Sequence, residues 1–338
     1  MSDDRPGNHW RRVRQGLAEA ARGWLYDPNV RFIDYGFPET DTELRLDDEP
    51  HIRVHVVHKF QQGPALEAAT ELGITRGEIP DQFAGIPVDR PQSSYRPHQP
   101  PWSAGGWTLG GTGIFSEPVN PRTRRTAPLR GGISVSDQYR RIAGTLGGPV
   151  VDRRTGALML LSNWHVLSGA YGRPGWSIYQ PGRGDGGGTA DGVATLERDA
   201  MAANLDAAVA TLNDERTVIN QPWGLPAVRD VNLAQLGMPV EKSGRTTGVT
   251  RGIVTGVEGT QRMYYAGVGY RVIRRVISIT PGDAELSRGG DSGSFWIEEG
   301  QGNVVALHFA GNQPSQPEEA LAIDIEPILD ALEVDLHV

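Results

Sequence analysis

The stretch 287-SRGGDSGS-294 carries the strongest local signal in the sequence, and the apolar run 295-FWI-297 follows it directly. A serine that lies between glycines and follows an aspartate is the pattern that a loop presenting a nucleophile needs. Gly290 and Gly293 have no Cβ, so the backbone can turn tightly there. The amides of Gly290 and Ser292 could then point at one spot and stabilise an oxyanion. Taken alone, the stretch is also compatible with a glycine-rich surface turn without a catalytic role.

A serine nucleophile needs a base, and the base needs a partner that orients it. His165 follows the apolar run 160-LLSNW-164, and Asp206 enters the run 205-LDAAVATL-212. An aspartate among Ala and Val is costly unless it is hydrogen-bonded, for example to an imidazole. Each residue alone is more often structural, but the ordered set His165, Asp206 and Ser292 seldom arises by chance. We therefore take these three residues as the candidate catalytic set.

Short apolar runs cut by Gly, Asp, Asn and Pro extend outward from this set, from Gly131 to the C-terminus. They include residues 144–152, 156–167, 205–212, 252–257, 270–279 and 302–311. Strands at this density favour an all-β barrel or sandwich. Only the end predicts a helix, because Pro327 stands in a first turn and Ile325, Ile328, Leu329 and Leu332 share a face.

Three separated segments, 162-SNWHV-166, 205-LDAAV-209 and 290-GDSG-293, together resemble the chymotrypsin-like (trypsin-like) serine peptidases. A fourth, 241-EKSGRTTG-248, resembles the bacterial α-lytic and streptogrisin-type branch. The resemblance spans roughly residues 140–334. It implies a mainly β fold of two packed six-stranded antiparallel barrels, with His165 and Asp206 on the first barrel, Ser292 on the second and the active site between them.

The resemblance also implies a role for each residue. Ser292 would attack the scissile carbonyl, His165 would take the serine proton and return it to the leaving amine, and Asp206 would hold the imidazole tautomer. The amides of Gly290 and Ser292 would form the oxyanion hole. The stretch Phe309-Ala310-Gly311 would be the edge strand that pairs with the substrate backbone.

Two departures from the family pattern carry expectations of their own. No Ile-Val-Gly-Gly start precedes the first barrel, so Asp291 has no freshly cut N-terminus to pair with. A buried aspartate needs a cation. We expect Lys242 to supply it, with Arg245 as the second choice, as in the bacterial branch that residues 241–248 resemble. Phe309 stands where many family members have a serine that supports the catalytic aspartate, so Asp206 must find another donor.

Substrate preference rests on three further residues. Leu286, six residues before Ser292, stands where the base of the specificity pocket is expected and argues against recognition of Arg or Lys. Ser287 and His308 would line the same pocket. A hydroxyl and an imidazole at these places resemble the glutamyl endopeptidases, which bind an acidic side chain. With equal weight, His308 fills a shallow pocket that prefers small or apolar side chains.

The composition changes before Gly131. Residues 10–25 predict an amphipathic helix, 29–36 and 51–60 strands, 64–73 a short helix and 86–89 one more strand, which makes a small α/β module over residues 1–95. Residues 96–130 predict a Pro- and Gly-rich linker, with Arg122, Arg124, Arg125 and Arg130 solvated, and residues 131–338 the peptidase domain. His51, His55 and His58 lack a nearby carboxylate in the sequence, and we expect solvent-facing strand residues there rather than a metal site.

The composition narrows the classes of function. The chain has 338 residues, a net charge of −8 and no cysteine. An acidic chain lacks the cationic field that nucleic-acid binders use, and a chain without cysteine forms no disulfide, thiolate zinc site or thiol nucleophile. No run of 18 apolar residues occurs. The first 24 residues hold no uninterrupted apolar segment, so we expect a cytoplasmic protein without a signal peptide.

These observations predict a serine endopeptidase that works through a Ser-His-Asp triad and an acyl-enzyme. No cofactor and no metal is expected. The expected partner is a protein or peptide substrate. Neither a nucleic acid nor a membrane is expected as a partner. The alternative is a catalytically weak or inactive peptidase-fold module that binds peptides or regulates. A third hypothesis is a scaffold whose N-terminal module docks a regulatory partner while the linker blocks the cleft. The oligomeric state stays open.

Overall fold

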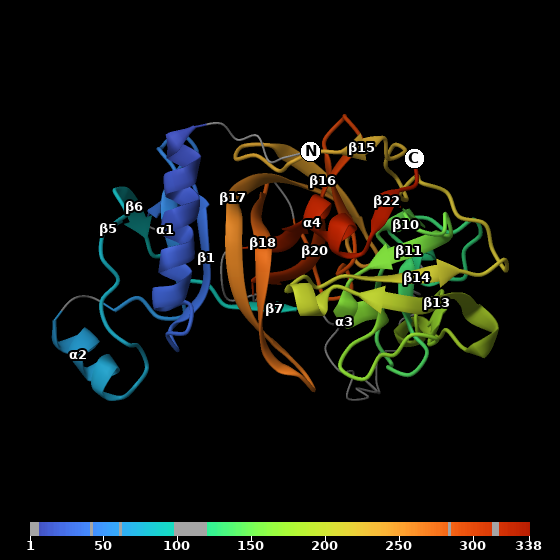
Figure 1. Cartoon of the computed structure of the whole chain (residues 1–338), viewed down its shortest axis with the longest axis horizontal. Coiled ribbons are helices and arrows are strands. Elements are labelled where there is room, and N and C mark those ends of the chain that lie inside the picture. The colour runs from blue at the N-terminus through green and yellow to red at the C-terminus, as the bar shows by residue number, and fades with distance from the viewer. Residues whose placement is uncertain (1–6, 41–42, 61–62, 98–119, 283–284, 313–317) are drawn as a thin grey trace, which may run out of the picture.

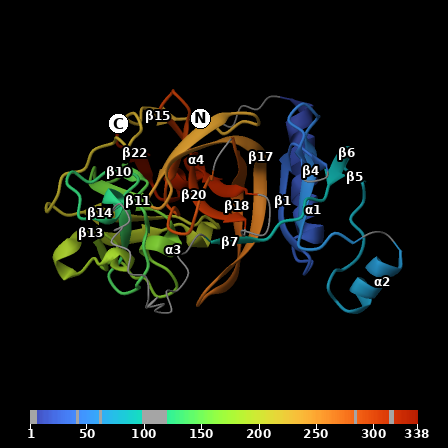
Figure 2. The ribbon, with the colours of Figure 1, turned by 180° about the vertical axis from the view of Figure 1, so that it is seen from behind.

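The computed structural model describes residues 7–40, 43–60, 63–97, 120–282, 285–312 and 318–338. The fold is mainly β, and Figures 1 and 2 show three parts side by side along the long axis of the molecule. The N-terminal module lies at one end, the first barrel at the other, and the second barrel between them. Within the described ranges, no helix combines the length and the apolar character that crossing a membrane requires.

The first barrel occupies residues 134–212. Its strands pair antiparallel in the order β10-β11-β14-β13-β12-β8-β9. β9 and β10 are two halves of one extended stretch, since Thr145 pairs with Ser134 and Gly148 pairs with Leu161, and the sheet closes on itself through this stretch. The strands are β8 (Ser134–Asp137), β9 (Gly144–Thr145), β10 (Gly148–Asp152), β11 (Leu158–Ser162), β12 (Ser177–Tyr179), β13 (Gly192–Asp199) and β14 (Ala208–Leu212). The short helix α3 (Trp164–Leu167) follows β11.

The second barrel has the strand order β16-β19-β20-β21-β18-β17, and β17 pairs with β16 again, so this sheet also closes. Its strands are β16 (Pro239–Gly244), β17 (Gly248–Tyr265), β18 (Gly269–Pro281), β19 (Phe295–Glu298), β20 (Asn303–Asn312) and β21 (Ala320–Asp324). The helix α4 (Ile325–Ala331) follows and leads into β22 (Val334–Leu336), which pairs with β10 of the first barrel. The predicted pair of antiparallel barrels and the C-terminal helix are therefore confirmed.

The N-terminal module contains α1 (Asn8–Trp24), β1 (Val30–Gly36), β2 (Glu39–Thr40), β3 (Glu43–Leu44), β4 (His51–Val56), α2 (Pro64–Glu71), β5 (Gln82–Phe83) and β6 (Ile86–Asp89). The predicted helices and strands form close to their expected positions. β1 pairs antiparallel with β17, with Phe32 opposite Gln261 and Tyr35 opposite Val257. The module therefore extends the sheet of the second barrel, which the sequence pattern did not predict.

A shared apolar core fixes this arrangement. The amphipathic face of α1 buries Val13, Leu17 and Ala20 against β1. The same apolar cluster contains Val254 and Ile277 of the second barrel. Because full burial of one large aliphatic side chain is worth about 1.5–3 kcal/mol, this cluster holds the module firmly on the barrel.

The prediction of solvent-facing histidines is wrong for His55, which is 1% exposed. β4 lies inside the sheet, between β1 and β6, and the His55 ring packs against the rings of Phe32 and Tyr95. His55 Nε2 lies 3.2 Å from Oδ1 of Asp34, a carboxylate that the sequence spacing hides because it belongs to the neighbouring strand. His58 is exposed, as expected, and His51 is partly buried.

Part of the expected linker packs on the barrels. Residues 98–119 lie outside the described residues, and the chain resumes at residue 120 with the 3₁₀ helix η1 (Pro121–Thr123). Three further 3₁₀ helices, η2 (Arg183–Asp185), η3 (Thr189–Asp191) and η4 (Met201–Ala203), lie within the first barrel, and the short strand β15 (Asp230–Val231) lies between the two barrels in sequence. Arg122, expected to be solvated, is buried. Its guanidinium donates to Ser243 Oγ at 2.6 Å and to the carbonyls of Gly132 and Trp223. These three acceptors offset the loss of water, whereas Arg124 and Arg125 are exposed as expected.

Candidate active site

His165 and Asp206 form a direct, buried contact in the first barrel. His165 lies on α3, and Asp206 immediately precedes Ala207 and β14. The distance from His165 Nδ1 to Asp206 Oδ2 is 2.5 Å, and the backbone N–H of His165 donates to Asp206 Oδ1 at 3.0 Å. Since an ionised carboxylate only accepts hydrogen bonds, Nδ1 carries the proton and Nε2 presents a lone pair. Among the described residues Nε2 is buried and has no hydrogen-bond partner.

Tyr265 supplies the donor that Asp206 was expected to need. Its hydroxyl donates to Asp206 Oδ2 at 2.8 Å from the end of β17, so a residue of the second barrel supports a carboxylate of the first. Burial, together with the nearby Asp206 charge, raises the pKa of Tyr265 well above its ordinary value, so the phenol stays a donor. Sequence reasoning missed this residue because nothing in the local pattern of β17 marks it.

Ser292 lies on the loop that precedes β19, at the contact between the two barrels. Its carbonyl accepts a hydrogen bond from Thr145 N at 2.7 Å. A Cβ built on Gly144 would lie 2.4 Å from a methyl carbon of Val166 and 3.1 Å from the carbonyl oxygen of Ser292. The residue after His165 and the backbone of Ser292 therefore meet at the same glycine. Ser292 Oγ donates to the carbonyl of Phe309 at 3.2 Å.

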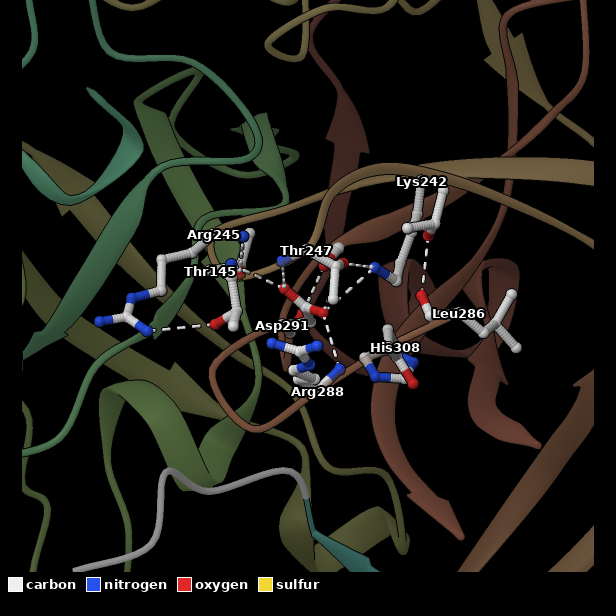
Figure 3. A network of polar contacts seen from close by, with 12 residues as sticks. Thr145, Lys242, Arg245, Thr247, Leu286, Arg288, Asp291 and His308 are labelled. Carbon is white, nitrogen blue, oxygen red and sulfur yellow. Dashed lines mark hydrogen bonds and ion pairs between the residues drawn. The ribbon is translucent and has the colours of Figure 1, made fainter. Parts of the chain in front are cut away.

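Asp291 is the centre of the polar network in Figure 3. Lys242 Nζ lies 3.3 Å from Asp291 Oδ2, and both side chains are completely buried. Thr247 and Arg288 donate to the same carboxylate through backbone or hydroxyl groups. Burial lowers the pKa of Lys242, while the ammonium and the donors hold the pKa of Asp291 below its ordinary value against the effect of burial. Arg245, the second choice, pairs instead with Asp185.

Two hydroxyl groups hold the backbone just before Ser292. Thr246 Oγ1 donates to the carbonyl of Gly289 at 2.9 Å, and Thr145 Oγ1 donates to the carbonyl of Gly290 at 2.7 Å. Because a trans peptide points its N–H opposite to its carbonyl, the N–H of Gly290 is directed away from Thr246. Gly290 has φ +102°, and a Cβ there would lie 2.5 Å from Thr246 Oγ1. Only glycine therefore fits this loop.

The three residues expected around the specificity pocket lie on the second barrel. Leu286 is fully buried in the core, where it packs beside Gly252, rather than facing an open pocket. The amides of Leu286 and Ser287 donate to Glu318 Oε1 at 2.6 and 3.0 Å, a carboxylate that sequence reasoning missed. His308 is also buried, and its Nδ1 accepts a long hydrogen bond of 3.4 Å from Trp296 Nε1. Since an indole only donates, this bond leaves the His308 proton on Nε2.

The stretch Phe309-Ala310-Gly311 lies in β20, but its edge is already paired. The strand β7 (Tyr95–Pro97) runs antiparallel beside it, with Ala310 opposite Pro97 and Gly311 opposite Arg96. The sequence predicted that this edge pairs with a peptide, and the peptide found there belongs to the chain itself.

Comparison with known proteins gives a likeness in fold. No family model matches the chain, and no curated protein matches it. The solved structures that resemble it are bacterial chymotrypsin-like serine proteases. Nocardiopsis protease is 18% identical, with 62% of this chain and 99% of that chain covered and a TM-score of 0.48. A glutamic acid specific serine protease, described as using a histidine triad in substrate binding, is 20% identical, with 62% and 100% covered and a TM-score of 0.47.

Cellulomonas bogoriensis chymotrypsin is a third such structure, 19% identical, with 62% of this chain and 98% of that chain covered and a TM-score of 0.45. At these identities the likeness concerns the fold, and it carries no conclusion about the activity of this chain.

Proposed function

We propose that the chain is a serine endopeptidase that hydrolyses peptide bonds through an acyl-enzyme. The observation that carries the proposal is the buried contact between His165 and Asp206, which leaves the lone pair of Nε2 without a partner among the described residues. A histidine in this state is a general base. The neighbouring loop carries Ser292, and the sequence around it fits a nucleophile.

In the proposed reaction, Ser292 Oγ turns from the Phe309 carbonyl to His165, gives its proton to Nε2 and attacks the scissile carbonyl carbon. The new oxyanion accepts hydrogen bonds from the amides of Gly290 and Ser292. His165 then passes the proton to the leaving amine, and the acyl-enzyme forms. Water, deprotonated by the same nitrogen, attacks the acyl group and restores the serine. Asp206 stays ionised throughout and stabilises the imidazolium.

A peptide library analysed by mass spectrometry tests this function. Wild-type chain should cut peptides at defined bonds, and Ser292→Ala should leave them intact. Asp214→Asn, on an exposed loop, is the control and should cut like wild type. Identical cleavage by wild type and Ser292→Ala would refute the proposal. A folded wild-type chain that cuts nothing, and whose Ser292 also fails to react with a small fluorophosphonate, would favour the inactive peptide-binding module.

The same library reports the preference for the residue before the cleaved bond. We propose that this residue is either acidic, held by the N–H of His308 Nε2 and the hydroxyl of Ser287, or small and apolar. Leu286 places no carboxylate at the base, and Glu318 is already engaged by two amides. Arg and Lys should therefore be depleted. Enrichment of Glu or Asp selects the acidic pocket, enrichment of Ala or Val selects the shallow one, and enrichment of Arg or Lys contradicts both.

Tyr265→Phe should lower kcat about 10–100-fold with little change in KM, because a hydrogen bond to a charged group is worth about 1.5–3 kcal/mol. Without this donor, the Asp206 carboxylate is held less firmly in the orientation that faces the imidazole. Tyr264→Phe is the matched control, since Tyr264 is the adjacent residue and is exposed. Equal kcat in the two variants would show that Tyr265 does not position the triad.

A further inference from the structure

One edge of β20 is shared between two neighbouring strands, β19 and β7. β19 pairs with the first half of the strand, with Phe295 opposite Leu307. From Ala310 onward β7 takes over this edge, and its register continues to Asn312, which lies opposite Tyr95. β21 covers the other side of β20 along the same residues. Since both sides of β20 are paired at Ala310 and Gly311, a peptide has no free backbone groups to pair with there.

The direction of β7 is that of a bound peptide approaching the nucleophile. β7 starts opposite Asn312 and ends opposite Ala310, so its C-terminal end points toward Phe309. The carbonyl of Phe309 accepts the hydrogen bond from Ser292 Oγ. In an extended peptide that pairs antiparallel with this edge, the residues before the reacting carbonyl would occupy the place of β7.

Side chains hold β7 in this place. The backbone N–H of Ser94 donates to Asn312 Oδ1 at 2.8 Å. Tyr95 is buried, its hydroxyl lies 2.8 Å from His55 Nδ1, and it also donates to Glu319 beside β21. Burial, strengthened by the charge of Glu319, raises the pKa of Tyr95 well above its ordinary value, so this hydroxyl stays a donor. Tyr95 therefore links β7 to His55 of the N-terminal module and to Glu319 of the second barrel.

Behind Tyr95 lies a buried network that the proposed reaction does not use. Arg53 Nε donates to Asp34 Oδ1 at 2.8 Å, and Ser278 Oγ of β18 donates to Asp34 Oδ2 at 2.9 Å. His55 links this pair to Tyr95. Burial alone would raise the pKa of Asp34. The charges and hydrogen bonds of Arg53 and His55 outweigh burial and lower this pKa to about 2. The network ties the module, β7 and the second barrel together, and Figure 1 shows β7 running between the module and the barrels.

We propose that β7 is a built-in occupant of the peptide-binding edge, so that another peptide pairs with Ala310–Asn312 only after β7 has left. The ligand class is an extended peptide backbone. The inference rests on the proposed function in one respect: it takes this edge of β20 to be the edge that a peptide substrate pairs with. In the full chain, β7 then limits the access of other peptides to this edge. The contacts between β7 and the N-terminal module set how often β7 leaves.

A binding experiment in the Ser292→Ala chain tests this occupancy without catalysis. The probe is the fluorescein-labelled pentapeptide Ser-Ser-Tyr-Arg-Pro, a copy of residues 93–97, followed by fluorescence anisotropy. Tyr95→Ala removes the anchor of β7. If β7 fills the edge for more than about nine-tenths of the time, affinity should rise about tenfold or more. Tyr139→Ala, at an exposed tyrosine, is the control and should leave affinity unchanged. Equal affinity of folded Tyr95→Ala and control chains overturns the proposal.

Hydrogen exchange gives a second measurement that needs no change in β7. Excess pentapeptide should speed the exchange of the amides of Tyr95 and Arg96 in the Ser292→Ala chain, because the peptide displaces β7. Unchanged exchange at saturating peptide overturns the proposal. A chain that binds more peptide after Tyr95→Ala, but hydrolyses none when Ser292 is present, keeps this inference and refutes the peptidase.

Discussion

Asp206→Asn should lower kcat about 10⁴-fold at pH 7, the size of effect expected when a catalytic histidine is held in the wrong tautomer. Asp206 accepts from every neighbour that the structure shows around its side chain. Oδ2 faces the imidazole and the hydroxyl of Tyr265, and Oδ1 faces the backbone N–H of His165. An asparagine must turn its NH₂ group toward one of these donors.

Either orientation of the amide is harmful. With NH₂ at the Oδ2 position, His165 would have to accept on Nδ1 and would carry its proton on Nε2, where the base is needed. With NH₂ at the Oδ1 position, two N–H groups would face each other. The measurement is kcat on a peptide that wild type cuts, with Asp214→Asn as the isosteric control on the surface. A loss below about tenfold would contradict the role given to Asp206.

Lys242→Met should cost about 3–5 kcal/mol of the free energy of unfolding, because it leaves the Asp291 carboxylate buried without its cation. Methionine keeps much of the side-chain volume, so the loss reports the charge rather than a cavity. Asp291 also fixes the loop through the backbone of Thr246, Thr247 and Arg288, and peptide hydrolysis should fall with stability.

Urea unfolding gives the free-energy change for this variant. The double variant Lys242→Met/Asp291→Asn removes both charges and should recover part of the loss, whereas a cavity effect would persist. If Lys242→Met leaves folding and hydrolysis unchanged, the ion pair between Lys242 and Asp291 does not stabilise the loop that carries Ser292.

The parts of the site that the sequence predicts are those written in short contiguous motifs. His165 and Asp206 stand in apolar runs where a polar residue needs a partner, and the structure pairs them directly. The need of a buried Asp291 for a cation, together with the resemblance of residues 241–248 to the bacterial branch, predicted Lys242, which lies against Asp291. The density of short apolar runs from Gly131 onward predicts an all-β barrel or sandwich. The pair of barrels was predicted from the resemblance of the motifs to the chymotrypsin-like peptidases.

The parts that the sequence does not predict depend on long-range strand pairing. Tyr265 reaches Asp206 only because β17 of the second barrel passes beside the first barrel. The local periodicity of the sequence does not predict that contact. His55 was expected to face solvent, yet Phe32 of β1 and Tyr95 of β7 cover its ring. The pairing of β7 with β20 joins residues more than two hundred positions apart.

The boundaries 1–95, 96–130 and 131–338 stay a prediction. The shared sheet between β1 and β17 argues that the N-terminal module does not behave as an independent unit, since removing it would expose the apolar residues that α1 and β1 cover. This is why the experiments on β7 use the whole chain.

The convergence of His165, Asp206 and Ser292 is tested most directly by a small fluorophosphonate, which needs no pairing with the β20 edge. Mass spectrometry of the labelled wild-type chain should find one adduct, on Ser292. Ser292→Ala should carry none, and His165→Ala should be labelled far more slowly. A folded wild-type chain that stays unlabelled, or that is labelled equally well after Ser292→Ala, would contradict the proposed triad.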